Sequence, residues 1–140
     1  VDSENFAVAP VERVLSRYGP AAGAAVYPVP DPRTGDQVMV AYELAPGAAF
    51  DPAGFVAFLE SQPDLGTKWA PRYVRVCDRL PLTGTNKLNK VPLRAAGWQT
   101  EDPVWHRPGR ELAYVPMTDA DRAALRAEFA TNGRAHLAPS

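Results

Sequence analysis

The sequence is poor in the residue types that build disulfide bonds and zinc sites. It contains a single cysteine, Cys77, which has no partner for an internal disulfide. Cys77 lies in the apolar run YVRVCDRL, so we expect a small buried side chain in a reducing cytoplasm, not a nucleophile. The two histidines, His106 and His136, are far apart and lack metal-ligand spacing to Cys77. The sequence therefore predicts no metal site.

Long hydrophobic runs and an excess of one charge are also missing. No apolar stretch approaches the roughly 20 residues that a membrane-spanning helix needs. The formal net charge is −1, and a near-neutral chain lacks the basic footprint of nucleic acid binding, so we expect no nucleic acid partner. Neither terminal helix combines a basic face with a broad apolar one, which leaves membrane contact without support. We expect a cytoplasmic protein, with membrane association as the unsupported alternative.

Familiar motifs of phosphate binding and nucleophilic catalysis are absent. The sequence has neither GxxxxGK[ST] nor GxGxxG, and no serine or cysteine lies in a GxSxG turn. Asp119 and Asp121 are paired acids, but both fall in the first turn of a predicted helix, where carboxylates oppose the helix dipole favourably. Hydrophobic residues make up 46% of the chain, which is enough for a core without disulfide bonds or a structural metal. The chain opens on Val1, and we expect it to be a piece of a longer polypeptide.

Hydrophobic periodicity predicts helices and strands in the first two thirds of the chain. Residues 9–18 and 49–61 have apolar side chains at helical spacing, each with a proline in the first turn. In the second of these helices Asp51 is expected to be the N-cap. Strands rich in β-branched and aromatic residues are predicted at residues 24–29, 37–44 and 71–80.

The last third of the chain has weaker patterns until its final helix. Residues 91–98 predict a short helix or turn, and residues 99–117 an extended arm. Thr118 is a typical N-cap, and Asp121 completes a capping-box arrangement three residues later. Gly133 is expected to end this helix, followed by a frayed tail.

These elements together predict an α+β fold. We expect a small mixed, largely antiparallel sheet flanked by helices, because the strands are too few for a doubly wound sheet. Residues 1–140 are expected to form a single domain. Its core would span residues 3–98, and the extended arm and terminal helix residues 99–133.

A loop with two lysines, LPLTGTNKLNKVPLR at residues 80–94, follows the last predicted strand. Its small residues predict a flexible segment whose backbone N–H groups approach an anion. These residues are Thr83, Gly84, Thr85 and Asn86. Lys87 is a compact charge on a long stem, suited to balancing a phosphate or carboxylate. Its competing interpretation is a solvent lysine, because the spacing K-x-x-K has little specificity by itself.

The lysine loop resembles the C-terminal catalytic-lysine motif of the adenylate-forming superfamily, the acyl-CoA synthetases and their relatives. In that motif Pro-x-Thr-x-Thr-Gly-Lys-x-x-Lys is followed by Leu-Arg. The residues that match in register are Pro81, Thr83, Thr85, Lys87, Lys90, Leu93 and Arg94. The glycine that usually precedes the lysine is Asn86 in this sequence.

Two further blocks extend this resemblance over most of residues 3–122. SENFAVAPVERVL is similar to the GENxxxxEVExVL segment that opens the small domain of these enzymes. The matching residues are Glu4, Asn5, Val11, Glu12, Val14 and Leu15. The tail VW…RELAYVPMTDAD is similar to very-long-chain acyl-CoA synthetases of the fatty-acid-transport-protein type.

The resemblance implies the C-terminal lid domain of an ATP-dependent fatty-acid–CoA ligase. In this family a large N-terminal domain binds ATP, with Mg²⁺, and the fatty acid, and an acyl-adenylate forms. The small domain then rotates, and the thiol of coenzyme A attacks. Lys87 would bridge the carboxylate and the phosphate, and the loop that supports it would be Thr83, Gly84, Thr85, Asn86 and Lys90. Residues near the coenzyme A tunnel would be Ser3, Glu4 and Asn5, with Ser3 replacing the usual glycine.

Because the nucleotide- and acyl-binding parts of the large domain are missing, the 140-residue chain alone is expected to be inactive. Lys90 either supports the loop or is simply solvated. The whole protein is alternatively a ligase for another carboxylic acid, or one that transfers its adenylate to a carrier-protein thiol. A different alternative is a non-catalytic α+β binding module whose arm carries Trp105 and Tyr114 as partner anchors. Such aromatics more ordinarily cover the edge of a core.

Overall fold

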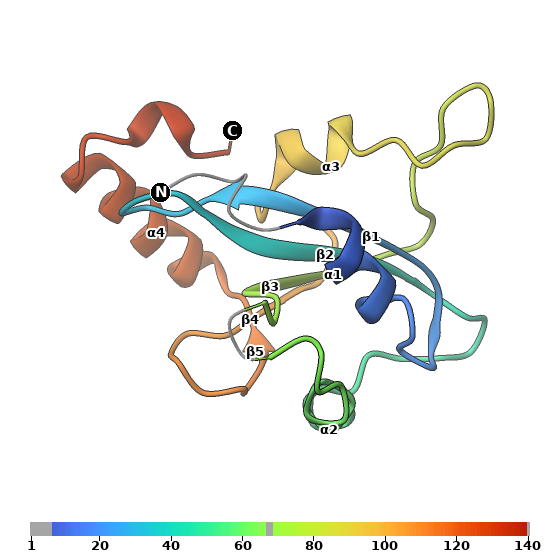
Figure 1. The fold of residues 1–140 in the computed structure, drawn as a ribbon. Coiled ribbons are helices and arrows are strands. Elements are labelled where there is room, and N and C mark those ends of the chain that lie inside the picture. Colours follow the sequence, from blue (N-terminus) through green and yellow to red (C-terminus); the bar gives the residue numbers. More distant parts are fainter. Residues whose placement is uncertain (1–6, 67–68, 140) are drawn as a thin grey trace.

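The computed structural model describes residues 7–66 and 69–139 of the chain. The three expected tunnel residues, Ser3, Glu4 and Asn5, lie outside the described residues. Figure 1 shows a twisted sheet with helices on both of its faces. This arrangement confirms the predicted α+β class.

The helices and strands alternate irregularly along the chain. The helices are α1 (Val8–Leu15), α2 (Pro52–Glu60), α3 (Val91–Ala96), α4 (Asp119–Thr131) and the 3-10 helix η2 (Ala135–Leu137). The strands are β1 (Ala21–Pro30), β2 (Asp36–Leu44), β3 (Tyr73–Cys77), β4 (Val104–His106) and β5 (Val115–Pro116).

The five strands form one sheet in the order β1-β2-β3-β4-β5. The long hairpin of β1 and β2 is antiparallel, with Pro30 opposite Asp36 next to the turn. Strand β3 runs parallel to β2, and the pairings β3–β4 and β4–β5 are antiparallel. The sheet is therefore mixed and largely antiparallel, as predicted, and β1 lies at one edge.

Alternation along the strands produces two hydrophobic cores, one on each face of the sheet. On β2, Val40 and Tyr42 belong to the core that Leu15 of α1 and Phe55 of α2 complete. Met39 and Ala41, which alternate with them along the strand, belong to the opposite core, which contains side chains from α3 and α4. Each fully buried side chain of this size contributes about 1.5–3 kcal/mol of hydrophobic free energy. Helices α1 and α2 thus cover one face, and α3 and α4 the other (Figure 1).

The C-terminal third is more ordered than its sequence predicts. The expected arm at residues 99–117 contributes β4 and β5, which extend the sheet beyond β3. The frayed tail is a wrong prediction, because η2 forms there and Leu137 packs against the second core. Pro139 also approaches Gly97, where an added Cβ atom would meet its ring at 3.3 Å. Apolar contacts of the tail with the sheet explain the order.

Helix α4 begins as its sequence predicts. The hydroxyl oxygen of Thr118 accepts a hydrogen bond from the Asp121 backbone N–H at 3.1 Å. The Asp121 carboxylate in turn accepts from the Thr118 N–H at 2.9 Å, which completes the capping box. Asp51 occupies the N-cap position of α2, although its side chain makes no capping hydrogen bond.

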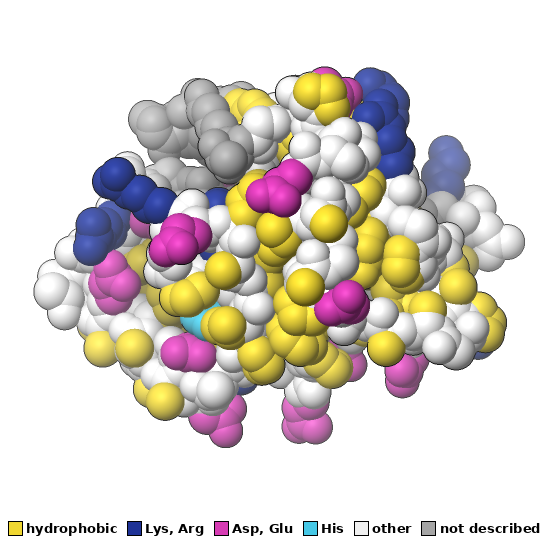
Figure 2. Space-filling view, turned by 90° about the horizontal axis from the view of Figure 1, so that it is seen from below, with side chains coloured by type: hydrophobic (Ala, Val, Ile, Leu, Met, Phe, Trp, Pro, Cys, Tyr) yellow, Lys and Arg dark blue, Asp and Glu magenta, His cyan; other side chains and the backbone are white. Residues whose placement is uncertain are grey.

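The molecular surface on the side of α2 is mixed in character. Figure 2 shows hydrophobic side chains interspersed with acidic ones over the middle of this face, and basic side chains at its edges. The face that the view shows therefore has no continuous basic patch over its centre.

Candidate functional site

The lysine loop is closed into a hairpin that projects from the body of the protein. Leu82 and Leu88 form an isolated antiparallel bridge, and the Thr83 N–H donates to the Lys87 carbonyl at 2.7 Å. In Figure 1 this segment is the yellow-green loop at the upper right, beyond α3. The sequence predicts a flexible loop here, whereas the structure shows a tight hydrogen-bonded turn.

Hydrogen bonds within the turn occupy several of the backbone N–H groups at the lysine loop. The Asn86 N–H donates to the Thr83 carbonyl at 2.9 Å, and the Lys87 N–H to the Thr83 hydroxyl at 3.2 Å. The hydroxyl of Thr85 lies 3.1 Å from that of Thr83. Since the N–H groups of Thr83, Asn86 and Lys87 all donate inside the turn, the expected backbone cradle is not formed by them.

Asn86 has the left-handed backbone conformation, with φ of 63°. Asparagine tolerates this conformation better than most residues, and glycine adopts it without a steric cost. The conformation explains why glycine is usual at this position in the motif and why asparagine replaces it. Gly84 has no such requirement, because an added Cβ atom would meet nothing within 4 Å.

The ammonium group of Lys87 has no partner among residues 7–66 and 69–139. The side chain is exposed at the end of the turn. Among the residues that the structure describes, none forms a hydrogen bond or ion pair with its Nζ atom. The hairpin therefore holds the backbone of Lys87 in place and leaves its charge unpaired within the described part of the chain.

Lys90, three residues further along the chain, is fixed to the protein. Its Nζ atom lies 2.7 Å from Oε2 of Glu12 and 2.8 Å from the Val26 carbonyl oxygen. The same Glu12 oxygen accepts a hydrogen bond from the Val26 N–H at 2.8 Å. Only 29% of the Lys90 side chain is exposed. This geometry argues for the supporting interpretation of Lys90, although its role in a reaction stays a prediction.

Exposed apolar side chains lie on both sides of Lys87 in the sequence. Leu82 is 53% exposed and Val91 is 74% exposed. The described residues contain one further large hydrophobic side chain of this kind, Val115.

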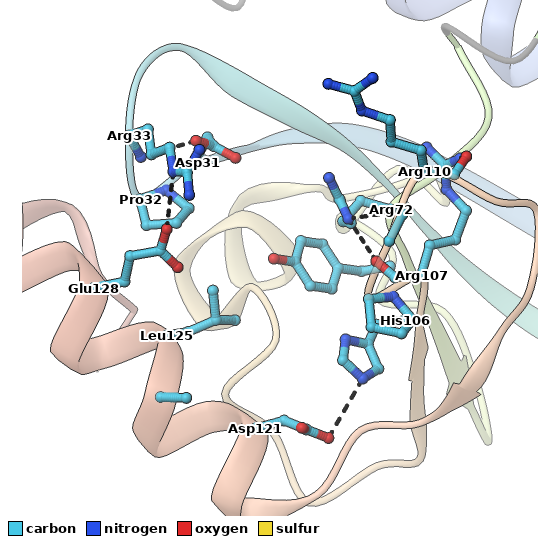
Figure 3. A pocket seen from close by; sticks show the side chains of 14 residues that line it. Asp31, Pro32, Arg33, Arg72, His106, Arg107, Arg110, Asp121, Leu125 and Glu128 are labelled. Atoms are coloured by element: carbon cyan, nitrogen blue, oxygen red, sulfur yellow. Dashed lines mark hydrogen bonds and ion pairs between the residues drawn. The ribbon is translucent and has the colours of Figure 1, made fainter.

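A polar pocket of about 480 Å³ lies elsewhere, between the β1–β2 turn, β4 and α4. Figure 3 shows arginines on one side of it and charged residues of the turn and α4 on the other. The labelled arginines of the first side are Arg72, Arg107 and Arg110. On the side of the turn and α4, Arg33 forms an ion pair with Glu128 at 3.1 Å. Nothing in the sequence indicated this pocket. It is also separate from the lysine hairpin, because α4, which lines the pocket, and the hairpin lie at opposite ends of Figure 1.

His106 and Asp121 join β4 to α4 at one end of this pocket. The His106 Nε2 atom lies 3.3 Å from a carboxylate oxygen of Asp121 (Figure 3). Burial lowers the pKa of His106, although the Asp121 carboxylate acts in the opposite direction. The hydrogen bond from the Thr118 N–H is the main reason that the pKa of Asp121 is lowered. Asp121 thus caps the helix, as predicted, and also contacts a histidine that burial keeps neutral.

The remaining titratable candidates do not form a reactive centre. Cys77 is buried, which confirms the predicted burial, and burial raises the pKa of its thiol to about 11. In residues 7–66 and 69–139 no three His, Cys, Asp or Glu side chains gather in a way that could hold a metal ion. None of the helices described there is long and apolar enough to cross a membrane.

The aromatic residues of the expected arm are part of the core. Tyr114 is buried, and its hydroxyl donates to the Pro71 carbonyl. Trp105 packs against the core on the α1–α2 face, 5.2 Å from Phe50 between ring centroids. Since Tyr114 is inaccessible and Trp105 is half-buried, the structure contradicts a binding module that uses this pair as partner anchors.

Glu12 and Val26 are the contacts that sequence reasoning missed. Glu12 was noted only as a match to the motif, and nothing in the sequence marks Val26. One signal for Glu12 was present, because it lies beside Val11 and near Leu15 on the side of α1 that faces the protein. A carboxylate there needs a partner, and Lys90 supplies it.

Residues 10–87 match the family model described as AMP-binding enzyme C-terminal domain. Steroid-22-oyl-CoA synthetase of Rhodococcus jostii is 50% identical over 135 residues, which cover 96% of this chain and 24% of that protein. The medium/long-chain-fatty-acid–CoA ligase FadD17 of Mycobacterium tuberculosis is 58% identical over 105 residues, 75% of this chain and 21% of the ligase.

At lower identity, the chain is also similar to a fatty acid transport protein and to an amide bond synthetase. Long-chain fatty acid transport protein 1 of Mus musculus is 29% identical over 125 residues, covering 87% of this chain and 19% of that protein. Among solved structures, the amide bond synthetase McbA from Marinactinospora thermotolerans superposes with a TM-score of 0.57 at 35% identity. That match covers 68% of this chain and 19% of McbA. The chain thus spans about a quarter or less of each protein it matches.

Proposed function

This chain belongs to the AMP-binding enzyme C-terminal domain family of the adenylate-forming acyl-CoA synthetases, and we propose that it is the lid of a fatty-acid–CoA ligase. The complete enzyme would join the carboxylate of the acid to the α-phosphate of ATP, releasing pyrophosphate and forming an acyl-adenylate. The thiol of coenzyme A would then attack the acyl carbon and release AMP. Residues 1–140 would act as one domain that covers the first site and rotates for the second.

The observation that carries the proposal is the free ammonium of Lys87 on a closed hairpin. Joining a carboxylate to a phosphate brings two anions together, and negative charge concentrates in the transition state. A positioned cation offsets that charge most strongly where water is excluded. The hydrogen-bonded turn holds the backbone of Lys87. Its side chain makes no contact with the described residues that would have to be broken before it could reach the reacting groups.

The partner that covers Lys87 would be the large N-terminal domain of the same polypeptide. The matched regions make up only 24% and 21% of these two relatives, so most of each relative has no counterpart in this chain. Leu82 and Val91 flank the lysine and expose 53% and 74% of their surface. Burial of these two side chains against the large domain would stabilise the state in which Lys87 reaches the carboxylate and phosphate.

The substrates are the finer part of the proposal. The names of the two most similar relatives cited above concern a steroid-22-oyl group and medium- or long-chain fatty acids. We therefore propose an acid with a large apolar body, bound with ATP and Mg²⁺ by the large domain. Ser3, Glu4 and Asn5 would line the path of coenzyme A. A cytoplasmic location stays a prediction.

Transfer to an acceptor other than coenzyme A is a second candidate. It is favoured by the similarity to McbA, which is named an amide bond synthetase. Supplying the full-length enzyme with fatty acid, ATP and either coenzyme A or a primary amine distinguishes the two. Thioester formation with coenzyme A supports the ligase, and amide formation without thioester supports the alternative.

The decisive experiment replaces Lys87 in the full-length polypeptide. Lys87→Ala is expected to lower acid-dependent ATP–pyrophosphate exchange by roughly 10²–10³-fold, as for loss of one transition-state donor. Thioester formation from a supplied acyl-adenylate should remain, because the lysine acts only in the first step. Arg13→Ala, which removes an exposed cation on α1, is the matched control and should change neither reaction.

Two results would contradict this assignment. Unchanged exchange in Lys87→Ala would leave the lysine without a chemical role. An equal loss in both half-reactions would show a misplaced domain instead of a missing charge. The 140-residue chain alone is expected to form no acyl-CoA, and detectable product would show that the large domain is dispensable.

A further inference from the structure

An ion pair covers the open edge of the sheet beneath the lysine hairpin. Among the described strands β1 has a single neighbour, β2, so one row of its backbone groups faces away from the sheet. Val26 lies in the middle of β1, opposite Val40 of β2. Its N–H donates to Glu12 and its carbonyl accepts from Lys90, so both groups are satisfied by side chains. The unpaired backbone groups of an edge strand can pair with other chains, whereas those of Val26 bind side chains of the same protein.

We name the contact of Glu12 and Lys90 on Val26 the edge clamp. Its three distances are 2.7 Å between the charges, 2.8 Å to the Val26 carbonyl and 2.8 Å from the Val26 N–H. Hydrogen bonds that involve charged partners are short and strong, and all three are of this kind. The two side chains expose 27% and 29% of their surface, so water and salt screen the clamp less than an ordinary surface pair.

The clamp fixes the base of the hairpin that carries Lys87. Lys90 immediately precedes α3 and ties this point to β1 and α1. One residue earlier, the Asn89 N–H donates to the Pro81 carbonyl at 2.9 Å and closes the base of the hairpin. The position of the Lys87 backbone relative to the sheet therefore depends on a contact between segments that are 64 residues apart in sequence.

We propose that Glu12 and Lys90 are positioning residues for adenylation. They act through Lys87 by holding its hairpin at one orientation on the sheet edge, and they touch no reacting atom. The inference rests on the proposed function of Lys87. A displacement of about 1 Å in a positioned group can cost as much as 100-fold in rate, so a loosened hairpin is expected to slow the step that needs Lys87.

The test uses full-length enzyme with substitutions that keep side-chain size and remove charge. Glu12→Gln and Lys90→Met should each lower kcat of ATP–pyrophosphate exchange by roughly tenfold, with KM for ATP unchanged. The double variant should lose no more than the more affected single variant, because either change alone opens the clamp. Thioester formation from supplied acyl-adenylate should be unaffected.

Matched variants separate positioning from general damage. Lys90→Arg keeps the charge and donors, and it should restore most of the exchange rate. Glu60→Gln on α2 and Arg13→Met on α1 remove exposed charges of the same sign as Glu12 and Lys90, and they should behave like the unmodified enzyme. Lys87→Ala is measured in parallel.

The outcomes distinguish this inference from the proposed function. Unchanged exchange in Glu12→Gln and Lys90→Met, together with collapse in Lys87→Ala, would overturn the clamp and leave the function of Lys87 intact. Unchanged exchange in Lys87→Ala would overturn both. Equal losses in the two half-reactions of the clamp variants would assign Glu12 and Lys90 a structural role only.

Discussion

Lys87 and Lys90 stand three residues apart in one loop, and the structure treats them in opposite ways. Lys87 is exposed and has no partner in the described part of the chain, whereas Lys90 binds Glu12 and the backbone of β1. The same residue type thus supplies a free charge in one position and an anchor in the other. The comparison teaches that Lys87 can be exposed and still have a defined position, because Lys90 holds the same loop on β1.

The largest expected effect is on the activity of a Lys87 variant whose stability is unchanged. Lys87→Met in the full-length enzyme should lower ATP–pyrophosphate exchange by roughly 10²–10³-fold. The free energy of unfolding should stay within about 0.5 kcal/mol of the unmodified protein, as for other surface substitutions. Exchange assays and thermal unfolding of the same preparation check both. A clear drop in melting temperature would show that Lys87 has a hidden structural partner.

Lys90→Met should lower stability as well as exchange, with the exchange loss, roughly tenfold, smaller than that of Lys87→Met. The Glu12 carboxylate and the Val26 carbonyl each lose a charged donor, which is expected to cost about 1–2 kcal/mol in the free energy of unfolding. For a chain of this size the melting temperature should fall by roughly 3–8 °C. Thermal unfolding of Lys90→Met, Glu12→Gln and the double variant forms a cycle. Additive losses would show that the two side chains do not interact energetically.

Asn86 tests whether the turn conformation matters to Lys87. Asn86→Ala places a residue with a Cβ atom and no compensating side-chain polarity at φ of 63°, and is expected to cost roughly 1 kcal/mol. Asn86→Gly should be neutral or slightly stabilising to the turn, because glycine adopts this conformation freely. Exchange should fall only a few-fold in Asn86→Ala. If Ala and Gly behave alike, the left-handed conformation is unimportant for placing the lysine.

The smallest effect concerns His106 on β4, which is separated in the sheet by β2 and β3 from the strand that Lys90 contacts. Burial lowers its folded-state pKa below the ordinary value of 6.5, so the unfolded chain binds the proton more readily. The stability that neutral His106 contributes is therefore present above pH 6.5 and lost as the pH falls through the folded pKa. Thermal unfolding should become easier from pH 7 to pH 5.

A histidine substitution identifies the source of that pH dependence. His106→Gln should weaken the fall in melting temperature between pH 7 and pH 5 and leave exchange at pH 7.5 unchanged. The matched variant is His136→Gln on η2, whose side chain is exposed. An identical pH dependence in His106→Gln and the unmodified protein would contradict the assignment. Asp121 has a lowered pKa, and its contribution is lost only at more acidic pH, below its ordinary value of 3.8.

Local patterns predicted most of the fold. The strands near residues 24–29 and 37–44, and the capping box of Thr118 and Asp121, were recognisable because neighbouring residues decide them. The arm at residues 99–117 was harder, since β4 and β5 have only three and two residues. Such short segments become strands only when a longer strand, here β3, offers them hydrogen bonds.

The candidate site was predictable in its residues and not in its contacts. The motif identified Lys87 and Lys90, yet it could not show which lysine would be free. Lys90 differs from Lys87 because Glu12 and Val26 approach it from distant parts of the sequence. The hydrogen bonds of the turn were missed as well, because small polar residues are compatible with open and closed loops alike.

By itself, the sequence determined the α+β class, the N-terminal cap of α4 and the lysine motif, because periodicity and short-range hydrogen bonds depend on residues a few positions apart. Only the tertiary structure decided that the C-terminal tail packs on the sheet and that Lys90 closes a clamp on β1. Those contacts join segments distant in the chain, and they form only once the two hydrophobic cores have brought α1, β1 and the lysine hairpin together.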